Sequence, residues 1–235
     1  MSAENKPFWT PKTLAAAGVV AAIAIAAIVL SLFNLTDRGP AGVPSSSSPA
    51  EPSRVGDCPQ LPADTGAGTV SEAPATKWTL VGRMAAPEVA DAGPAVVDPD
   101  GWRHCYARTP TGALVAAANY IAMTGVPELV GRLAKDGIMP GDLRDRALST
   151  PIPSGPHSSA PMQFRGFRVV SFTPDMAVID LAIEMRGNST SATMTLRWYQ
   201  GDWRIGVRGE GAAQELDIDY GNLPSLYGYV NWAGA

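Results

Sequence analysis

The stretch LRWYQGDWRIGV, residues 196–207, indicates the fold class because it predicts two short strands joined by a turn. Apolar and polar side chains alternate on both sides of Gly201-Asp202, which is the period-two pattern of a half-buried hairpin. Trp198 and Trp203 share the parity of the aliphatic residues, so we interpret them as core side chains rather than as an aromatic platform for a ligand. Asp202 is explained by its place in the turn.

The same alternation extends backwards from this hairpin. In AVIDLAIEMR (177–186), Ile179 and Leu181 point to one face while Asp180 and Glu184 point to the other, which predicts a strand with one buried and one solvated face. Turn residues separate this strand from its neighbours. Four strands are therefore predicted in an antiparallel meander, over 164–172, 177–186, 189–200 and 203–207.

Helices precede the meander. The run TPTGALVAAANYIAMTG begins with Thr109 as a cap and Pro110 in the first position, and it ends at Gly125, which predicts one helix. Residues 127–137 repeat this pattern, and a short third helix is expected over 142–148. The predicted fold class is α+β, with two to three helices packed on a curved four-stranded antiparallel sheet over residues 109–235. Residues 58–108 are predicted to be an extended segment that wraps over this domain, with a short strand at 77–84.

Residues 13–33, TLAAAGVVAAIAIAAIVLSLF, carry no charge. A helix of this length is roughly 31 Å long, which matches the hydrocarbon thickness of a bilayer. Lys6 and Lys12 precede it, so the positive-inside rule predicts a cytoplasmic tail over 1–12 and an extracytoplasmic C-terminal domain. A cleaved signal peptide is the alternative, but the apolar run is long for one and lacks a small-residue cleavage site. We therefore expect a single-pass protein of the cell membrane.

The segment 34–57 is rich in Pro and Ser, which predicts a flexible tether between the membrane and the domain. The chain has two cysteines, Cys58 and Cys105, and both lie beyond the span, where an oxidising compartment favours a disulfide. His104 precedes Cys105, which raises the alternative of a thiol–imidazole nucleophile, but a disulfide would consume that thiol. No metal-ligand spacing, cofactor motif or catalytic motif occurs, so we do not expect an enzyme. The net charge of −4 gives no reason to expect nucleic acid.

Exposed aromatic and arginine residues mark the expected partner surface. They comprise Arg197, Tyr199 and Arg204 on the outer sheet face, and Tyr227, Tyr229 and Trp232 in the C-terminal tail. For the tail an alternative stays open, in which it folds back over an edge or a hydrophobic seam of its own domain.

The order of helices followed by a curved meander resembles the cone-shaped nuclear-transport-factor-like fold. With one span in front, the chain is similar in architecture to the bitopic scaffold subunits of type IV secretion and conjugation machines. More locally, GWRHCYARTPTGALVAAANY, LRWYQGDWRI and LYGYVNW resemble an uncharacterised family of membrane-anchored actinobacterial proteins of conjugative and phage-like elements. These motifs are structural, so the resemblance implies no catalytic residues.

Two hypotheses about function follow. The first is a non-enzymatic assembly component that contacts other subunits of an envelope complex, with a homo-oligomer as a further expected partner. The second is an extracytoplasmic ligand-binding or enzymatic domain, because the cone fold in other families houses pockets with an Asp or His at their base. A deep cavity with a buried carboxylate would favour the second hypothesis.

The predicted topology can be tested with protease on intact spheroplasts. Because residues 1–12 are expected in the cytoplasm, the protease should digest the chain beyond about residue 38 and leave a small anchored stub. Immunoblotting with tags at both ends measures this, and a protected C-terminal tag would contradict the orientation.

Overall fold

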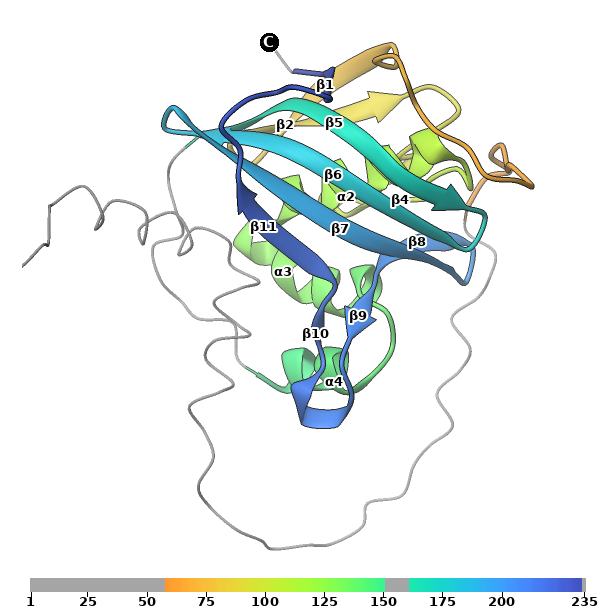
Figure 1. Ribbon diagram of the computed structural model, residues 1–235. Helices are drawn as coiled ribbons and strands as arrows, with labels where there is room; N and C mark the ends of the chain where they lie inside the picture. Colours follow the sequence, from red (N-terminus) through yellow and green to blue (C-terminus); the bar gives the residue numbers. More distant parts are fainter. Residues whose placement is uncertain (1–57, 151–160, 234–235) are drawn as a thin grey trace, which may run out of the picture.

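A curled sheet that half encloses one helix is the centre of the structure (Figure 1). The computed structural model describes residues 58–150 and 161–233 of the chain. The helical elements in these ranges are α2 (Pro110–Thr124), α3 (Pro127–Arg132), the π-helical turn η2 (Leu133–Gly137), α4 (Asp142–Ser149) and the 3-10 turn η3 (Gly211–Ala213). The strands are β1 (Thr76–Val81), β2 (Met84–Val89), β3 (Val96–Val97), β4 (Arg103–His104), β5 (Met162–Thr173), β6 (Met176–Met185), β7 (Asn188–Tyr199), β8 (Asp202–Ile205), β9 (Val207–Arg208), β10 (Glu215–Leu216), β11 (Ile218–Asn222) and β12 (Val230–Asn231).

The α+β class and the predicted meander are confirmed, but the sheet is larger than four strands. β5, β6, β7 and β8 pair antiparallel in sequence order. Within the described residues the main sheet has eight strands in the order β1-β2-β5-β6-β7-β11, with β8 also paired to β7 and β12 to β5. Two register shifts in β5 interrupt its pairing with β6, and such bulges increase the bend and twist of a strand. The long strands therefore curl into a half-barrel.

Helix α2 lies in the concave side of this half-barrel. Thr109 caps it as predicted, because its hydroxyl accepts a hydrogen bond from the N–H of Gly112 at 3.0 Å. Nearly every side chain of α2 is buried, since β2, β5, β6, β7 and β8 contact it together with α3 and η2. A Cβ at Gly112 would lie 2.0 Å from the carbonyl oxygen of Ala107, so only glycine lets these two segments approach.

The segment predicted to wrap over the surface instead contributes strands to the main sheet. β1 and β2 form a hairpin around Gly82, and β2 joins β5 in parallel through Met84 and Met162. The sequence concealed β2 because MAAPEV contains small residues and Pro87, which are uncommon in strands. Pro87 is tolerated because, in the described residues, β2 pairs with β5 only at Met84.

A buried polar network joins β2, β4 and α2. The guanidinium of Arg103 donates to Glu88 and to Asn119, both at 2.7 Å, and Asn119 donates in turn to the carbonyl of Pro87. Burial raises the pKa of Glu88, but hydrogen bonds from Lys77, Arg103 and Thr79 outweigh it and lower the pKa to about 2. The network is therefore charged at neutral pH and fully paired.

The C-terminal tail crosses the outer face of the sheet (Figure 1). Asp180 was predicted to lie on the solvated face of its strand, yet it is 2% exposed. The hydroxyl of Tyr229 donates to its carboxylate at 2.6 Å, and Arg168 pairs with the same oxygen while it stacks over the Tyr229 ring. The tail thus covers a face that would otherwise be wet.

Trp232 lies in the core, so at this residue the tail folds back onto its own domain rather than facing a partner. β12 pairs with β5, and the Trp232 ring packs at 5.0 Å from Trp78 and at 5.4 Å from Phe167, measured between ring centroids. Its indole N–H donates to Thr76 at 2.8 Å. The expected role of Trp232 as an exposed partner anchor is wrong, because the residue closes a seam of its own domain.

The predicted membrane span, cytoplasmic tail and tether lie outside the described residues. Within residues 58–150 and 161–233, no helix combines the length and apolar character needed to cross a bilayer.

Replacing Trp232 by alanine should destabilise the domain, because a buried ring and its hydrogen bond are lost. We expect a decrease of about 3 kcal/mol in the free energy of unfolding, measured by denaturant unfolding of the full chain in detergent. Tyr227→Ala is the matched control, since this neighbouring aromatic residue is 93% exposed and should cost less than about 0.5 kcal/mol. Equal losses in the two variants would contradict the packing described.

Candidate functional site

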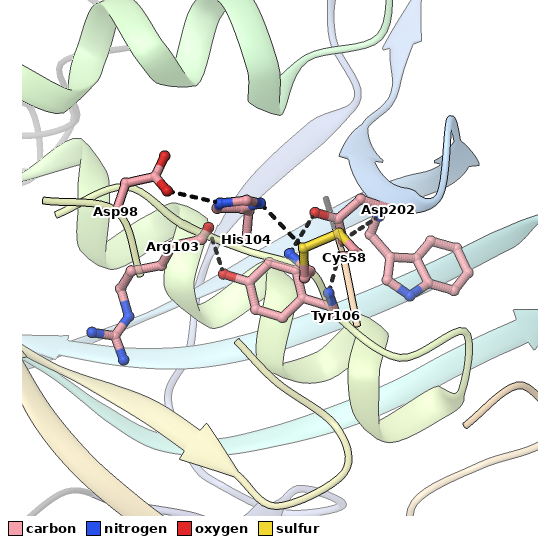
Figure 2. Close-up of a disulfide and its surroundings, with 8 residues drawn as sticks. Cys58, Asp98, Arg103, His104, Tyr106 and Asp202 are labelled. Carbon is pink, nitrogen blue, oxygen red and sulfur yellow. Dashed lines mark hydrogen bonds and ion pairs between the residues drawn. A yellow bond between two sulfur atoms is a disulfide. The ribbon is translucent and has the colours of Figure 1, made fainter. Parts of the chain in front are cut away.

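The predicted disulfide is confirmed, and Figure 2 shows it with its surroundings. Cys58 and Cys105 are bonded, with their Cα atoms 5.4 Å apart and 47 positions between them in sequence. Cys58 is exposed, whereas Cys105 is fully buried. By the loop-entropy argument, a bridge that closes a loop of this length contributes about 4 kcal/mol to stability.

A buried carboxylate fixes the backbone around Cys105. Asp202, which is 3% exposed, accepts hydrogen bonds from the N–H groups of Cys105 at 2.8 Å, Tyr106 at 3.0 Å and Trp203 at 2.9 Å. Cys105 has a φ of +67°, a left-handed conformation that is costly for a residue with a side chain, and the carboxylate helps to hold it. The sequence pattern explains Asp202 only as a turn residue between β7 and β8, but in the structure it connects this turn to a segment almost one hundred positions away.

The electrostatics of Asp202 follow from its burial. Loss of water raises the pKa of Asp202, although the hydrogen bonds from Tyr106 and Cys105 act in the opposite direction. Both carboxylate oxygens already accept backbone N–H groups. Its geometry is that of a structural anchor between two segments.

His104 lies between a carboxylate and the disulfide. Its Nε2 is 3.2 Å from Oδ1 of Asp98, and its Nδ1 is 3.2 Å from Sγ of Cys105. Figure 2 shows Asp98 and Asp202 on opposite sides of this histidine–disulfide pair. Burial raises the pKa of Asp98, but hydrogen bonds from His104 and Arg132 outweigh it and hold the pKa below its usual range. The sulfurs are bonded to each other, so no thiolate is present to act as a nucleophile or to bind a metal.

A half-open pocket of about 610 Å³ adjoins the disulfide. Residues 58–63 form one wall, and the β7–β8 turn with Trp198, Asp202 and Arg204 forms the other. Backbone hydrogen bonds hold the first wall in place, from Asp64 N–H to the carbonyl of Arg108 and from Arg108 N–H to the carbonyl of Pro62. The disulfide is therefore part of the pocket wall.

Arginines and tryptophans dominate the chemistry of this pocket. Arg108 stacks over Trp198 and pairs with Asp175, and Arg132 stacks over Trp102. Arg132 is also neutralised by three carboxylates, those of Asp98, Asp100 and Asp136, at 2.9–3.0 Å.

Arg204 differs from these two arginines. It is half-buried in the pocket wall and lies directly opposite Arg197 in the β7–β8 register. Among the residues that the structure describes, no carboxylate lies within ion-pair distance of either guanidinium. Two like charges face each other across the strands, which is unfavourable unless an anion joins them.

The six residues predicted as a partner surface do not form one patch. Arg197, Tyr199 and Arg204 lie together on β7 and β8, with Tyr199 opposite Asp202. Tyr229 and Trp232 serve the fold of the tail, while Tyr227 is almost fully exposed. Of the six, only Arg204 lines the pocket.

The sequence interpretation missed most of the pocket. The sequence patterns do not indicate the pocket residues Trp102, Arg108 and Arg132, although the first two flank His104 and Cys105 in GWRHCYARTP. They also do not indicate Asp98, which contacts His104. That concentration of polar and aromatic side chains around a cysteine was the available signal. Arg132 and residues 58–63 offered none, because only the tertiary fold brings them to this place.

A comparison with protein families matches residues 38–231 to the family described as Domain of unknown function (DUF8175). The chain belongs to this family. No curated protein and no solved structure matches it. The match covers the described domain up to β12, together with the sequence just before Cys58.

Replacing Asp202 by alanine should leave three buried N–H groups without an acceptor. We expect a loss of about 3 kcal/mol in the free energy of unfolding, measured by denaturant unfolding of the full chain. Asp175→Ala is the matched control, because its side chain is 80% exposed and its ion pair with Arg108 contributes below about 1 kcal/mol. A loss no larger than that of the control would contradict the anchoring role.

Proposed function

We propose that this chain is a membrane-anchored, extracytoplasmic assembly component of an envelope complex of the conjugation or type IV secretion kind. In this proposal the span over 13–33 anchors the chain, residues 34–57 hold the domain away from the membrane, and the pocket beside the disulfide docks a partner protein. The half-barrel around α2 supports a relationship to the cone-shaped nuclear-transport-factor-like fold, which several scaffold subunits of this architecture use. The disulfide supports an oxidising compartment.

The observation that carries the docking proposal is the pair Arg197 and Arg204. These arginines face each other across β7 and β8, and neither forms an ion pair with a carboxylate in the described part of the chain, although Arg204 attracts the nearby Asp202 carboxylate. Arg204 also lines the pocket. A carboxylate from outside would join both guanidinium groups and remove their mutual repulsion. The expected ligand group is therefore an anion.

The neighbouring side chains specify the rest of the partner. Trp198 is half-buried at the pocket, and Trp102 lies in its floor under Arg132. Tryptophan and arginine are the residues most often found as energetic centres of protein interfaces. We infer that the partner inserts an acidic side chain next to an apolar or aromatic one, from a protein segment that lies along the β7–β8 edge.

The alternative is a ligand-binding or enzymatic domain, and one observation favours it. The pocket does hold a buried carboxylate, that of Asp202, whose pKa is raised by burial. Against catalysis, both oxygens of this carboxylate accept backbone N–H groups, so a general base would have to give up its own structural bonds. A small organic anion bound to Arg204 is the form of this alternative that the geometry supports.

A photo-crosslinking residue at Gln200, which is exposed at the pocket rim, tests the proposal in native membranes. We expect crosslinks to another subunit of the envelope complex, identified by mass spectrometry. Arg204→Glu should reduce the crosslinked product about thirtyfold, because the loss of a central interface arginine costs about 2 kcal/mol. Arg186→Glu is the matched control, since Arg186 is exposed in the turn at the other end of β7 and should leave the product unchanged.

Three results would contradict docking of a partner subunit. The first is a crosslink that is equally strong in both charge-reversal variants. The second is a small anion, retained by the purified chain in native mass spectrometry and lost in Arg204→Glu, without any protein crosslink. The third is normal transfer of the host element in a strain that lacks the gene.

A further inference from the structure

We propose that the Cys58–Cys105 disulfide is a site of thiol–disulfide exchange, in which an external dithiol attacks Cys58 and His104 assists the departure of Cys105. This inference does not depend on the docking proposal. It rests on the geometry of the histidine and on the unequal exposure of the two cysteines.

The first observation is the row Asp98, His104, Cys105 (Figure 2). Nδ1 of His104 is 3.2 Å from the Cys105 sulfur, and its other nitrogen is 3.2 Å from the Asp98 carboxylate. Asp98 is itself fixed by Arg132 at 3.0 Å. The carboxylate thus orients the ring, with the remaining ring nitrogen directed at the sulfur.

The second observation is that the two cysteines differ in solvent exposure and in how firmly the fold holds their backbone. Cys58 is exposed, so an incoming thiolate meets it first. Cys105 is fully buried, and Asp202 holds its backbone through two consecutive N–H groups, those of Cys105 and Tyr106. Because these bonds do not involve the disulfide, Cys105 stays beside His104 when the bridge opens.

The chemistry balances as a two-electron exchange. A thiolate of the dithiol forms a bond to the Cys58 sulfur while the Cys58–Cys105 bond breaks, and the electron pair moves to the Cys105 sulfur. His104 supplies a proton from Nδ1 to this leaving group or pairs with it as an imidazolium. The second thiol of the reagent then attacks the mixed disulfide, which releases the Cys58 thiolate and oxidises the reagent to its disulfide. His104 touches the reacting sulfur and is a catalytic residue of this step, whereas Asp98 is a positioning residue.

Opening of the bridge has a defined structural consequence. Residues 58–63 form one wall of the pocket, and the hydrogen bonds between Arg108 and residues 62 and 64 do not involve the disulfide. Reduction therefore frees only residues 58–61 of this wall, because residues 62 and 64 stay hydrogen-bonded to Arg108. The exchange would widen the pocket mouth while the domain stays folded.

The rate constant for reduction by dithiothreitol tests the role of His104. The full chain in detergent is mixed with the reagent under native conditions, quenched by alkylation and analysed by mass spectrometry. His104→Gln should slow reduction about tenfold, because the leaving thiolate loses its proton donor. Asp98→Asn should also slow it, and Asp98→Glu should restore part of the rate. His157→Gln removes the other histidine of the chain and should leave the rate unchanged.

Folding of each variant is checked by its melting temperature. An unchanged rate in a folded His104→Gln variant would overturn the catalytic role.

A second measurement does not require any variant. Incubation of the unmodified chain with glutathione, followed by alkylation and peptide mapping, should find the glutathione adduct on Cys58 and the alkyl group on Cys105. An adduct confined to Cys105, or no adduct until denaturant is added, would overturn the proposal.

Discussion

The hydrogen bonds of the Asp202 carboxylate are the interaction on which the site depends. They join the β7–β8 turn to the N–H groups of Cys105 and Tyr106, which lie 97 and 96 positions away in sequence. Without this connection the left-handed backbone at Cys105 would lack its support, and the disulfide would join Cys58 to a segment no longer fixed to the β7–β8 turn. The pocket lies between these two parts of the chain, so its shape follows from the same three bonds. Burial makes the carboxylate costly to ionise and raises its pKa, and the N–H donors offset only part of this cost.

The half-barrel positions this site through α2. The curled sheet covers α2 on almost every side. As a result, the β7–β8 hairpin lies beside the residues just before α2, including Ala107. The indole N–H of Trp203 donates to the carbonyl of Ala107 at 2.8 Å, and the hydroxyl of Tyr120 on α2 donates to the carbonyl of Trp203. Trp203 therefore fixes the hairpin on the helix, as its parity in the sequence predicted.

Local patterns predicted a large part of the fold. Alternation gave the four meander strands, and caps gave the start and end of α2, because both signals depend on residues a few positions apart. Long-range contacts explain what was missed. β2 is concealed by Pro87, Asp180 is covered by a tail about fifty positions later, and Trp232 packs on Trp78 from the other end of the domain. For the site, the two cysteines and Arg204 were singled out, but Asp202, Trp102 and Arg132 acquire their roles only when the fold brings distant segments together.

The proposal that a native partner covers the pocket beside the disulfide can be tested by amide hydrogen exchange. Exchange is compared between the full chain in its native membranes and the purified chain. We expect protection in the membranes to be concentrated in residues 58–63 and 198–204. Protection confined to other parts of the domain, such as the exposed Tyr227 region of the tail, with no change in those two segments, would contradict it.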